Sequence, residues 1–396
     1  MSRPPRPRFP APVLVTESAD LAALVERLRA EPFVTVDTEF MRERTYYPEL
    51  CLVQLGGAAE VAVIDPLAPG LDLAPLGALF ADPTVLKVFH AARQDIEICV
   101  LRWGAVPAPL FDTQVAAMVA GFGDQVGYDT LVQQLAGGQI DKAHRFSDWS
   151  ARPLSPAQLA YAAADVTWLR VVYQGLRARL EADGRLDWVA EEMAVLTDPA
   201  TYRADPETAW QRLRPRSTNR RFLGQLRALA AWREREAQRV NIPRGRVLKD
   251  ETLLELAATA PDQPEALARA RGITRGFAEG RMGAGLLEAI AAARAEPDAA
   301  LPPAPVLPTA GERPSPALVA LLKVLLAAAC ERHHVAPKLV AVAEDLDRLA
   351  AGQDDGLAVL HGWRLAVFGT DALALRAGRI ALGVAGRDVR VIPIGG

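Results

Sequence analysis

Hydrophobic residues recur with two different periods in the N-terminal half of the chain, which predicts a domain of mixed strands and helices. The string FVTVDTEF carries the β-branched run Val34–Val36 and predicts a buried strand. The string VLKVFH predicts a second strand, and it leads into helical spacing at Ile96 and Trp103. An earlier strand at 13–16 and a helix capped near Ser18 begin the series. Alternation of this kind is typical of a sheet covered by helices.

A long helix is expected after this region, in the string SPAQLAYAAADVTWLRVVYQGL. Ser155 is the expected N-cap, Pro156 suits the first helical position, and Gln158 completes a capping box. Tyr161 and Asp165 are four residues apart, so they share one face of the helix. A Tyr and Asp pair of this kind is usually only a surface hydrogen bond, and it indicates chemistry only together with other residues.

The other residues of the candidate site are acidic. Asp37 and Glu39 are two apart in the first predicted strand, so they share a face, where they would repel each other unless a cation lay between them. The alternative is that the strand ends near Val36 and leaves both acids in solvent. Asp95 falls in the first turns of a helix. An acid at that position often has no role beyond a favourable interaction with the helix dipole. Because Mg²⁺ prefers carboxylate oxygens, these acids and Asp165 together match a site for paired divalent ions.

The motifs around these acids resemble those of a known superfamily. DTEF, HAARQD and YAAAD are similar to the three exonuclease motifs of the DEDD superfamily, in the subclass with tyrosine in the third motif. TYYPELCLVQL, LFDTQVAA, SDWSARPLSPAQLAYAAADV and NIPRGRVLKDETLLELA resemble bacterial ribonuclease D, and the resemblance is strong to about residue 290. It implies a multidomain chain, in which an α/β ribonuclease-H-like exonuclease domain is followed by two mainly α-helical HRDC-type bundles.

The resemblance also implies a 3′-5′ exoribonuclease that uses two divalent metal ions, Mg²⁺ or Mn²⁺. It places the metal ligands on Asp37, Glu39, Asp95 and Asp165, and it places on Tyr161 the tyrosine that orients or deprotonates the attacking water. All of these positions hold the expected residue type. The implied products are nucleoside 5′-monophosphates. The implied substrates are the single-stranded 3′ ends of tRNA precursors and other small structured RNAs.

Shifts in proline content and charge suggest where the domains end. We expect an exonuclease domain in residues 1–200, an HRDC domain in 206–293 and a second, diverged HRDC-like domain in 312–396. The string EPDAALPPAPVLPTAGERPSP, rich in proline and alanine, should be an extended and mobile linker between the last two. The end of the chain, RIALGVAGRDVRVIPI, alternates like strands and leaves open whether it pairs into a hairpin.

Composition limits the classes of protein to which the chain can belong. A length of 396 residues suggests two or three domains. The apolar runs fall far short of the ~20 residues that cross a bilayer, and MSRPPRPRFPAP lacks the apolar stretch of a secretory signal. The 3 cysteines are far apart and form no CxxC, which favours a reducing cytoplasm over disulfides or a zinc site. We therefore expect a cytoplasmic protein without a membrane partner, and a monomer.

Charge is unevenly distributed along the chain. The net charge of −3 does not favour a nucleic-acid partner, but the stretch from Arg203 to Asp250 holds 13 Arg and Lys against 5 Asp and Glu. A basic region next to an acidic catalytic domain is expected to bind phosphate groups, here those of RNA. The alternative is a set of solvated helix faces, because RALAAWREREAQR carries Glu beside Arg at helical spacing.

Roles are also expected for four more residues, and three of these have an alternative. Phe40 and Met41 follow the first motif and could stack on the terminal base, although core packing is an equal expectation for Phe40. His90 could contact substrate or form only a structural hydrogen bond. Asp112, in LFDTQ, is expected to cap a helix, with a contact to the metal ligands as the alternative.

Two other functions remain as alternatives. A DNA 3′-5′ exonuclease uses the same carboxylates, but no polymerase domain follows, and the flanking strings match ribonuclease D better. A non-catalytic RNA-binding protein would rely on the helical domains alone. The complete acidic set argues against that role, because four converging carboxylates would repel a phosphate unless metal ions were bound.

Overall fold

The computed structural model describes residues 10–215, 217–304 and 314–394. These residues form two compact units. The first contains the described parts of Met1–Glu39, Leu52–Pro199 and Pro308–Gly396, and the second contains Phe40–Cys51 and the described parts of Ala200–Leu307. The string MSRPPRPRF and the middle of the proline-rich linker string lie outside the described residues, so the expectations placed on them stay predictions.

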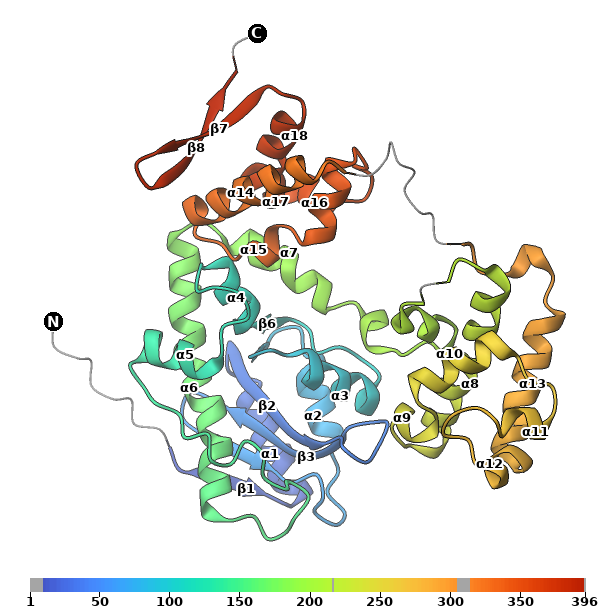
Figure 1. Cartoon of the computed structure of the whole chain (residues 1–396). Coiled ribbons are helices and arrows are strands. Elements are labelled where there is room, and N and C mark those ends of the chain that lie inside the picture. The colour runs from blue at the N-terminus through green and yellow to red at the C-terminus, as the bar shows by residue number, and fades with distance from the viewer. Residues whose placement is uncertain (1–9, 216, 305–313, 395–396) are drawn as a thin grey trace. The chain divides into compact units, whose positions relative to one another are not determined.

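A six-stranded mixed sheet with the order β1-β4-β3-β2-β5-β6 forms the centre of the first unit (Figure 1). β4 is parallel to β1 and antiparallel to β3, whereas β5 is parallel to both β2 and β6. Because β2 continues to Met41, Asp37 and Glu39 both lie within it, and the alternative of a strand that ends near Val36 is wrong. The strands are β1 (Pro12–Val15), β2 (Phe33–Met41), β3 (Glu49–Gly56), β4 (Val61–Ile64), β5 (Leu86–Phe89) and β6 (Leu110–Asp112).

Helices surround this sheet. They are α1 (Ser18–Leu28), α2 (Ala74–Ala81), α3 (Arg93–Trp103), α4 (Thr113–Val119), α5 (Tyr128–Leu131), the π-helical turn η1 (Val132–Ala136), α6 (Pro156–Ala182) and α7 (Leu186–Leu196). The capping box of α6 is confirmed, because the Ser155 hydroxyl accepts from the Gln158 N–H at 3.2 Å. The first helix begins at Ser18 as expected, but Ser18 does not cap it. Its hydroxyl bonds instead to the loop at Gly70 and Asp72, which leaves Glu17 at the N-cap position.

Helix α6 lies very close to strands β2 and β3, and this contact determines where the site forms. The Thr35 hydroxyl donates to the backbone carbonyl of Val166 at 2.7 Å. A Cβ atom on Gly56 would lie 2.4 Å from the same hydroxyl oxygen, so glycine is required for this approach. Thr35 and Asp37 share one face of β2, and Val166 follows Asp165 in α6. The packing therefore brings Asp165 over Asp37.

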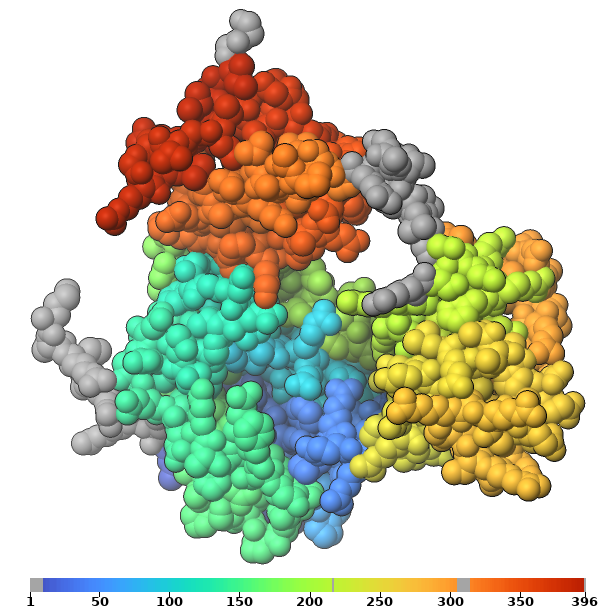
Figure 2. Space-filling model, in the orientation of Figure 1, coloured from blue at the N-terminus to red at the C-terminus, as the bar shows by residue number. Residues whose placement is uncertain are grey.

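The C-terminal segment of the first unit is helical and ends in a hairpin. Its helices are α14 (Pro316–His333), α15 (Pro337–Val340), α16 (Ala343–Ala350), the 3-10 turn η5 (Ala358–Leu360), α17 (Gly362–Arg364), the π-helical turn η6 (Leu365–Gly369) and α18 (Thr370–Arg376). Strands β7 (Ile380–Ala385) and β8 (Asp388–Pro393) pair antiparallel, so the end of the chain does form a hairpin. Figure 2 shows the orange atoms of this segment packed directly against the green-blue atoms of the α4 region.

The second unit is a helical bundle around a leucine-rich core. Its core includes Leu226, Leu253 and Leu286. The helices are α8 (Arg220–Val240), α9 (Arg244–Val247), α10 (Asp250–Thr259), α11 (Pro264–Leu267), α12 (Arg275–Glu279) and α13 (Arg281–Ala295), with the 3-10 turns η2 (Pro199–Tyr202), η3 (Pro206–Leu213) and η4 (Asp298–Ala300) before and after them.

Residues 40–51, which leave the sheet at the end of β2, belong to this second unit. The Tyr46 hydroxyl donates to the buried Glu234 carboxylate on α8, and the Arg244 guanidinium lies 4.6 Å from the centre of the Tyr46 ring. The side-chain oxygen of Asn241 accepts the backbone N–H groups of Tyr46 and Tyr47 at 3.1 and 3.0 Å. Side chains about 200 residues away along the chain thus hold this connection between β2 and β3.

Two expectations from composition concern cysteine chemistry and the membrane. Cys51, Cys99 and Cys330 are all buried, and none of them forms a disulfide. Among the residues that the structure describes, no helix combines the length and the apolar character needed to cross a bilayer.

Candidate active site

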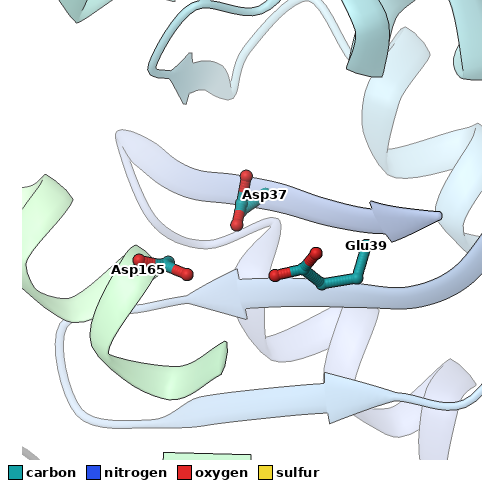
Figure 3. A group of neighbouring side chains, drawn as sticks. All are labelled: Asp37, Glu39 and Asp165. Atoms are coloured by element: carbon teal, nitrogen blue, oxygen red, sulfur yellow. The ribbon is translucent and has the colours of Figure 1, made fainter. Parts of the chain in front are cut away.

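Three carboxylates meet where α6 crosses β2. Asp37 and Glu39 extend from one face of the strand, Asp165 extends from the helix, and Figure 3 shows the three side chains turned toward one another. One oxygen from each carboxylate lies within 4.8 Å of the others. Carboxylate oxygens at this spacing are suitable ligands for hard divalent cations such as Mg²⁺.

The electrostatic surroundings of these acids disfavour their charged forms. Burial, followed by the neighbouring carboxylates of Asp165 and Asp95, raises the pKa of Glu39 to about 9. Burial, then Asp165 and other acids, raises the pKa of Asp37 well above its ordinary value. Burial also raises the pKa of Asp165 to about 7. Since a divalent cation would relieve both the burial cost and the mutual repulsion, these residues fit a metal site.

Asp95 lies beside this group without joining it. It extends from the first turn of α3, as expected, and is buried with 7% of its surface exposed. Its carboxylate accepts a hydrogen bond from the Thr38 hydroxyl at 2.5 Å. Burial raises the pKa of Asp95 to about 7, and the bond from Thr38 opposes this rise. The role of Asp95 as a fourth metal ligand stays a prediction.

Tyr161 lies one turn before Asp165 on α6 and faces the same cavity. Burial and then the carboxylates of Asp165 and Glu39 raise the pKa of the phenol above its ordinary value. The phenol therefore keeps its proton at neutral pH. Its O–H group can then both donate and accept a hydrogen bond next to the acidic group.

The cavity over the acids has a volume of about 410 Å³. Its lining combines the three carboxylates and Tyr161 with two cations, Lys142 and Arg145, from residues 137–155 between η1 and α6. Lys142 also pairs with Asp129 at 2.8 Å. A cavity lined both by carboxylates that could hold metal ions and by cations is suited to a phosphodiester.

The sequence analysis did not identify Lys142, Arg145 or Tyr128 as parts of the site. Tyr128 donates its hydroxyl to the backbone carbonyl of Asp165 at 2.5 Å and thereby supports the position of that turn of α6. The two cations lie in DKAHRFSDW, which has neither helical nor strand periodicity. The only feature of the sequence that could have identified them is that they lie next to the SDWSARPL string, which is part of the family resemblance.

The residues proposed from the sequence to contact substrate differ in their positions. His90 lines the cavity, and its Nδ1 also lies 3.0 Å from the Thr113 hydroxyl, so it has the features of both suggested roles. Phe40 and Met41 lie at the end of β2 and do not line this cavity. Their contact with a terminal base stays a prediction.

Asp112 caps helix α4, as the sequence predicted. Its carboxylate accepts the backbone N–H of Gln114 at 2.8 Å. It also accepts the N–H groups of Ala91 and Ala92 at 3.0 and 2.8 Å, and Ala91 has a positive φ of 58°. One carboxylate thus holds the start of α4 and the strained turn before α3, which carries Asp95.

Many arginines of the basic stretch are already paired with acids of the second unit. The ion pairs are Arg221–Asp298, Arg227–Glu296, Arg233–Asp250, Arg235–Glu207, Arg239–Glu236 and Arg244–Glu234. The exposed members of these pairs fit the alternative of solvated helix faces, whereas Arg233, Glu234 and Glu236 are buried and form structural contacts within the bundle. Arg212, Arg214, Arg246 and Lys249 are exposed and form no ion pair within the described residues, so they remain candidates for phosphate contacts.

Comparison with known proteins agrees with this site and fold. A 3′-5′ exonuclease model matches residues 12–181, and an HRDC domain model matches residues 222–290. Ribonuclease D of Granulibacter bethesdensis is 69% identical over 395 residues, which cover 100% of both chains. Ribonuclease D of Gluconacetobacter diazotrophicus is 68% identical over 393 residues, which cover 99% of this chain and 100% of that one.

A solved structure extends the likeness to three dimensions. The crystal structure of Escherichia coli RNase D, described as an exoribonuclease involved in structured RNA processing, has a TM-score of 0.79 and 30% sequence identity. The match covers 92% of this chain and 98% of that chain. The expected order of an α/β exonuclease domain and a helical HRDC domain is therefore confirmed.

Proposed function

Since this chain belongs to the ribonuclease D family of 3′-5′ exoribonucleases, we propose that it hydrolyses RNA by a two-metal mechanism in which the four carboxylates of its three motifs hold the ions. The observation that carries this proposal is the half-buried group of Asp37, Glu39 and Asp165, with one oxygen of each within 4.8 Å of the others. Asp95, held beside them by Thr38, is the fourth ligand. The ions, Mg²⁺ or Mn²⁺, would activate a water and stabilise the leaving oxygen.

The side chains around the ions orient the reactants. Tyr161 keeps its proton, so it positions the attacking water through a hydrogen bond rather than acting as a general base. Arg145 and Lys142, which line the same cavity, bind the phosphate. His90, Phe40 and Met41 contact the terminal nucleotide.

The reaction removes one nucleotide in each cycle. The water oxygen forms a bond to the last phosphorus of the RNA, and the bond from that phosphorus to the O3′ atom of the preceding nucleotide breaks. The shortened RNA retains a 3′-hydroxyl, and a nucleoside 5′-monophosphate leaves. The substrates are single-stranded 3′ ends of tRNA precursors and other small structured RNAs.

The remaining domains of the chain are proposed to support RNA binding. We assign residues 1–200 to the exonuclease domain, 206–293 to the HRDC domain and 312–396 to a second, diverged HRDC-like domain. The exposed, unpaired cations of the HRDC domain contact the RNA backbone, which is the usual source of sequence-independent affinity. The protein is proposed to act as a monomer in the cytoplasm.

Digestion of RNA labelled at its 5′ end tests the proposal. A ladder of products shortened one nucleotide at a time should appear with Mg²⁺ and disappear with a chelator. Asp37→Asn and Asp165→Asn should each lower the rate by several orders of magnitude, whereas Asp183→Asn, at an exposed acid on the same unit, should not.

Three further substrates separate the alternatives. A 3′-phosphate should block digestion, because the free 3′-hydroxyl is expected to bind near the ions. Matched DNA should be cut more slowly than RNA, and equal or faster cleavage would favour a DNA exonuclease. Efficient cutting of a circular RNA would rule out exonuclease action.

A further inference from the structure

Trp149 packs against the tyrosine of the third motif. It lies in the irregular residues 137–155 and is buried, with only 2% of its surface exposed. The centres of the Trp149 and Tyr161 rings are 5.9 Å apart, and the ring planes are inclined by 33°. The centre of the His144 ring lies 6.4 Å from that of Tyr161. The phenol therefore lies near two aromatic rings from one segment, and the Trp149 ring is the nearer of the two.

An ion pair with the sheet holds the backbone around Trp149. The Arg152 guanidinium donates to both carboxylate oxygens of Asp65, at 2.7 and 2.6 Å. A third donor of Arg152 binds the backbone carbonyl of Trp149 at 2.7 Å. Asp65 directly follows β4, and its own N–H donates to the Val15 carbonyl of β1 at 3.0 Å. Trp149 is thus fixed to two strands through a single arginine.

Packing alone orients the indole ring. Its Nε1 atom is buried and has no hydrogen-bond partner among the described residues. A ring held in this way affects its neighbour only through van der Waals contact. Tyr161 is the neighbour whose polar group faces the acids, so this contact limits where its hydroxyl can lie. A planar bidentate pair such as Arg152 and Asp65 restricts the geometry more than a single contact does.

We propose that Trp149, held by Arg152 and Asp65, is a positioning residue that keeps the Tyr161 hydroxyl aimed at the attacking water. The inference rests on the proposed role of Tyr161. Displacement of a catalytic group by about 1 Å can lower a rate by about 10²-fold. Loss of Trp149 should therefore lower the single-turnover rate by about that factor without changing the affinity for Mg²⁺.

A double-mutant cycle tests this coupling on the full-length protein. Trp149→Leu should lower the single-turnover rate by about 10²-fold in the wild type, but by less than about 3-fold in a Tyr161→Phe background. Trp149→Phe should restore most of the rate, because a smaller aromatic ring still packs against Tyr161 and the N–H that is removed makes no bond among the described residues. Arg152→Lys, which removes the bidentate pair, should produce an intermediate loss.

Controls separate positioning from a general loss of structure. Trp103→Leu removes a tryptophan of the same unit that packs on Phe80, and it should leave the rate unchanged. Thermal melts and calorimetric Mg²⁺ titrations of each variant should show a folded protein with wild-type metal affinity. Equal losses from Trp149→Leu in both backgrounds, or lost metal binding, would overturn the inference. If the Tyr161→Phe variant kept the wild-type rate, Tyr161 would have no role in the mechanism. The inference about Trp149 would then fail together with the proposed role of Tyr161.

Discussion

Thr38 lies between Asp37 and Glu39 in β2 and affects the charge of Asp95. Its hydroxyl donates to the Asp95 carboxylate, and this bond opposes the effect of burial, so that the pKa of Asp95 is raised only to about 7. Such a threonine has an electrostatic effect without belonging to the proposed set of metal ligands. The DTEF motif therefore contributes three side chains to the site, of which the sequence analysis identified two.

Replacement of this threonine should shift the pH dependence of metal binding. In Thr38→Val the Asp95 carboxyl loses its hydrogen bond, so its pKa should rise further above about 7. Less Asp95 is then ionised at neutral pH, and tight Mg²⁺ binding should require a higher pH than in the wild type. Calorimetric titrations between pH 6 and 9 would measure the shift. Asp95→Asn is the control, since it should weaken binding throughout this range.

At the scale of elements, the contact between β2 and α6 forces acids together. Without metal ions, the folded pKa values of Glu39, Asp95 and Asp165 are about 9, 7 and 7, all above the ordinary range. Between pH 5 and 9 these three acids therefore bind more protons in the folded chain than in the unfolded chain. Their contribution to the free energy of unfolding of the metal-free protein should fall as the pH rises through this range.

Thermal melts in a chelator at pH 5.5, 7 and 8.5 would measure this trend. The melting temperature should fall with pH, and Asp165→Asn should reduce the slope. Mg²⁺ should oppose the trend, because it binds the deprotonated carboxylates and therefore stabilises the folded state more at higher pH. At 100 times its Kd, an ion that binds only the folded state adds about 2.7 kcal/mol. A metal-free melting temperature that rises with pH would contradict the electrostatic description of the site.

Elements with local signals could be predicted from the sequence, and those fixed by distant contacts could not. The β-branched run of β2 and the capping box of α6 are local patterns, and both are confirmed. Residues 137–155 have no such pattern, because Arg152 is held by Asp65, 87 residues away. The proposed metal ligands were identified through motif resemblance, which supplied the long-range information that periodicity lacks.

At the scale of the whole molecule, helix α7 attaches the C-terminal segment to the rest of the first unit. Trp188 on α7 stacks on Trp363 with ring centres 4.7 Å apart. The buried Glu192 accepts from the Trp363 indole at 3.2 Å and pairs with Arg364 at 2.6 Å. Arg185 donates to the backbone carbonyl of His334 at 3.0 Å. The attachment thus combines aromatic packing with one enclosed ion pair.

Loss of Glu192 should weaken this attachment. Glu192→Ala leaves the largely buried Arg364 without its partner, which costs roughly 3 kcal/mol for a buried pair. Urea unfolding should show the C-terminal segment separating first, as an added early transition, and limited proteolysis should release it. Asp183→Ala removes an exposed pair with Arg179 and should change stability by less than about 0.5 kcal/mol. A single unchanged transition in Glu192→Ala would mean that packing alone holds the segment.

The distribution of charge pairs in the second unit predicts which cations contact RNA. Arg212, Arg214, Arg246 and Lys249 are exposed and have no ion pair in the described part of the chain. Arg244, in contrast, is engaged with the buried Glu234. Only unpaired cations can neutralise phosphates without first breaking a protein contact, so the RNA affinity should depend on the first set.

Substitution of these residues separates binding from structure. Arg246→Gln and Lys249→Gln should each weaken binding of a nuclease-inactive Asp37→Asn protein to RNA of any sequence, and each should reduce the slope of log affinity against log salt by about 1. Arg244→Gln should instead lower the melting temperature, because it leaves Glu234 buried without its cation. Fluorescence anisotropy at several salt concentrations, with melts of each variant, measures both effects. An unchanged salt slope in the double variant Arg246→Gln/Lys249→Gln would place the RNA contacts on other surfaces.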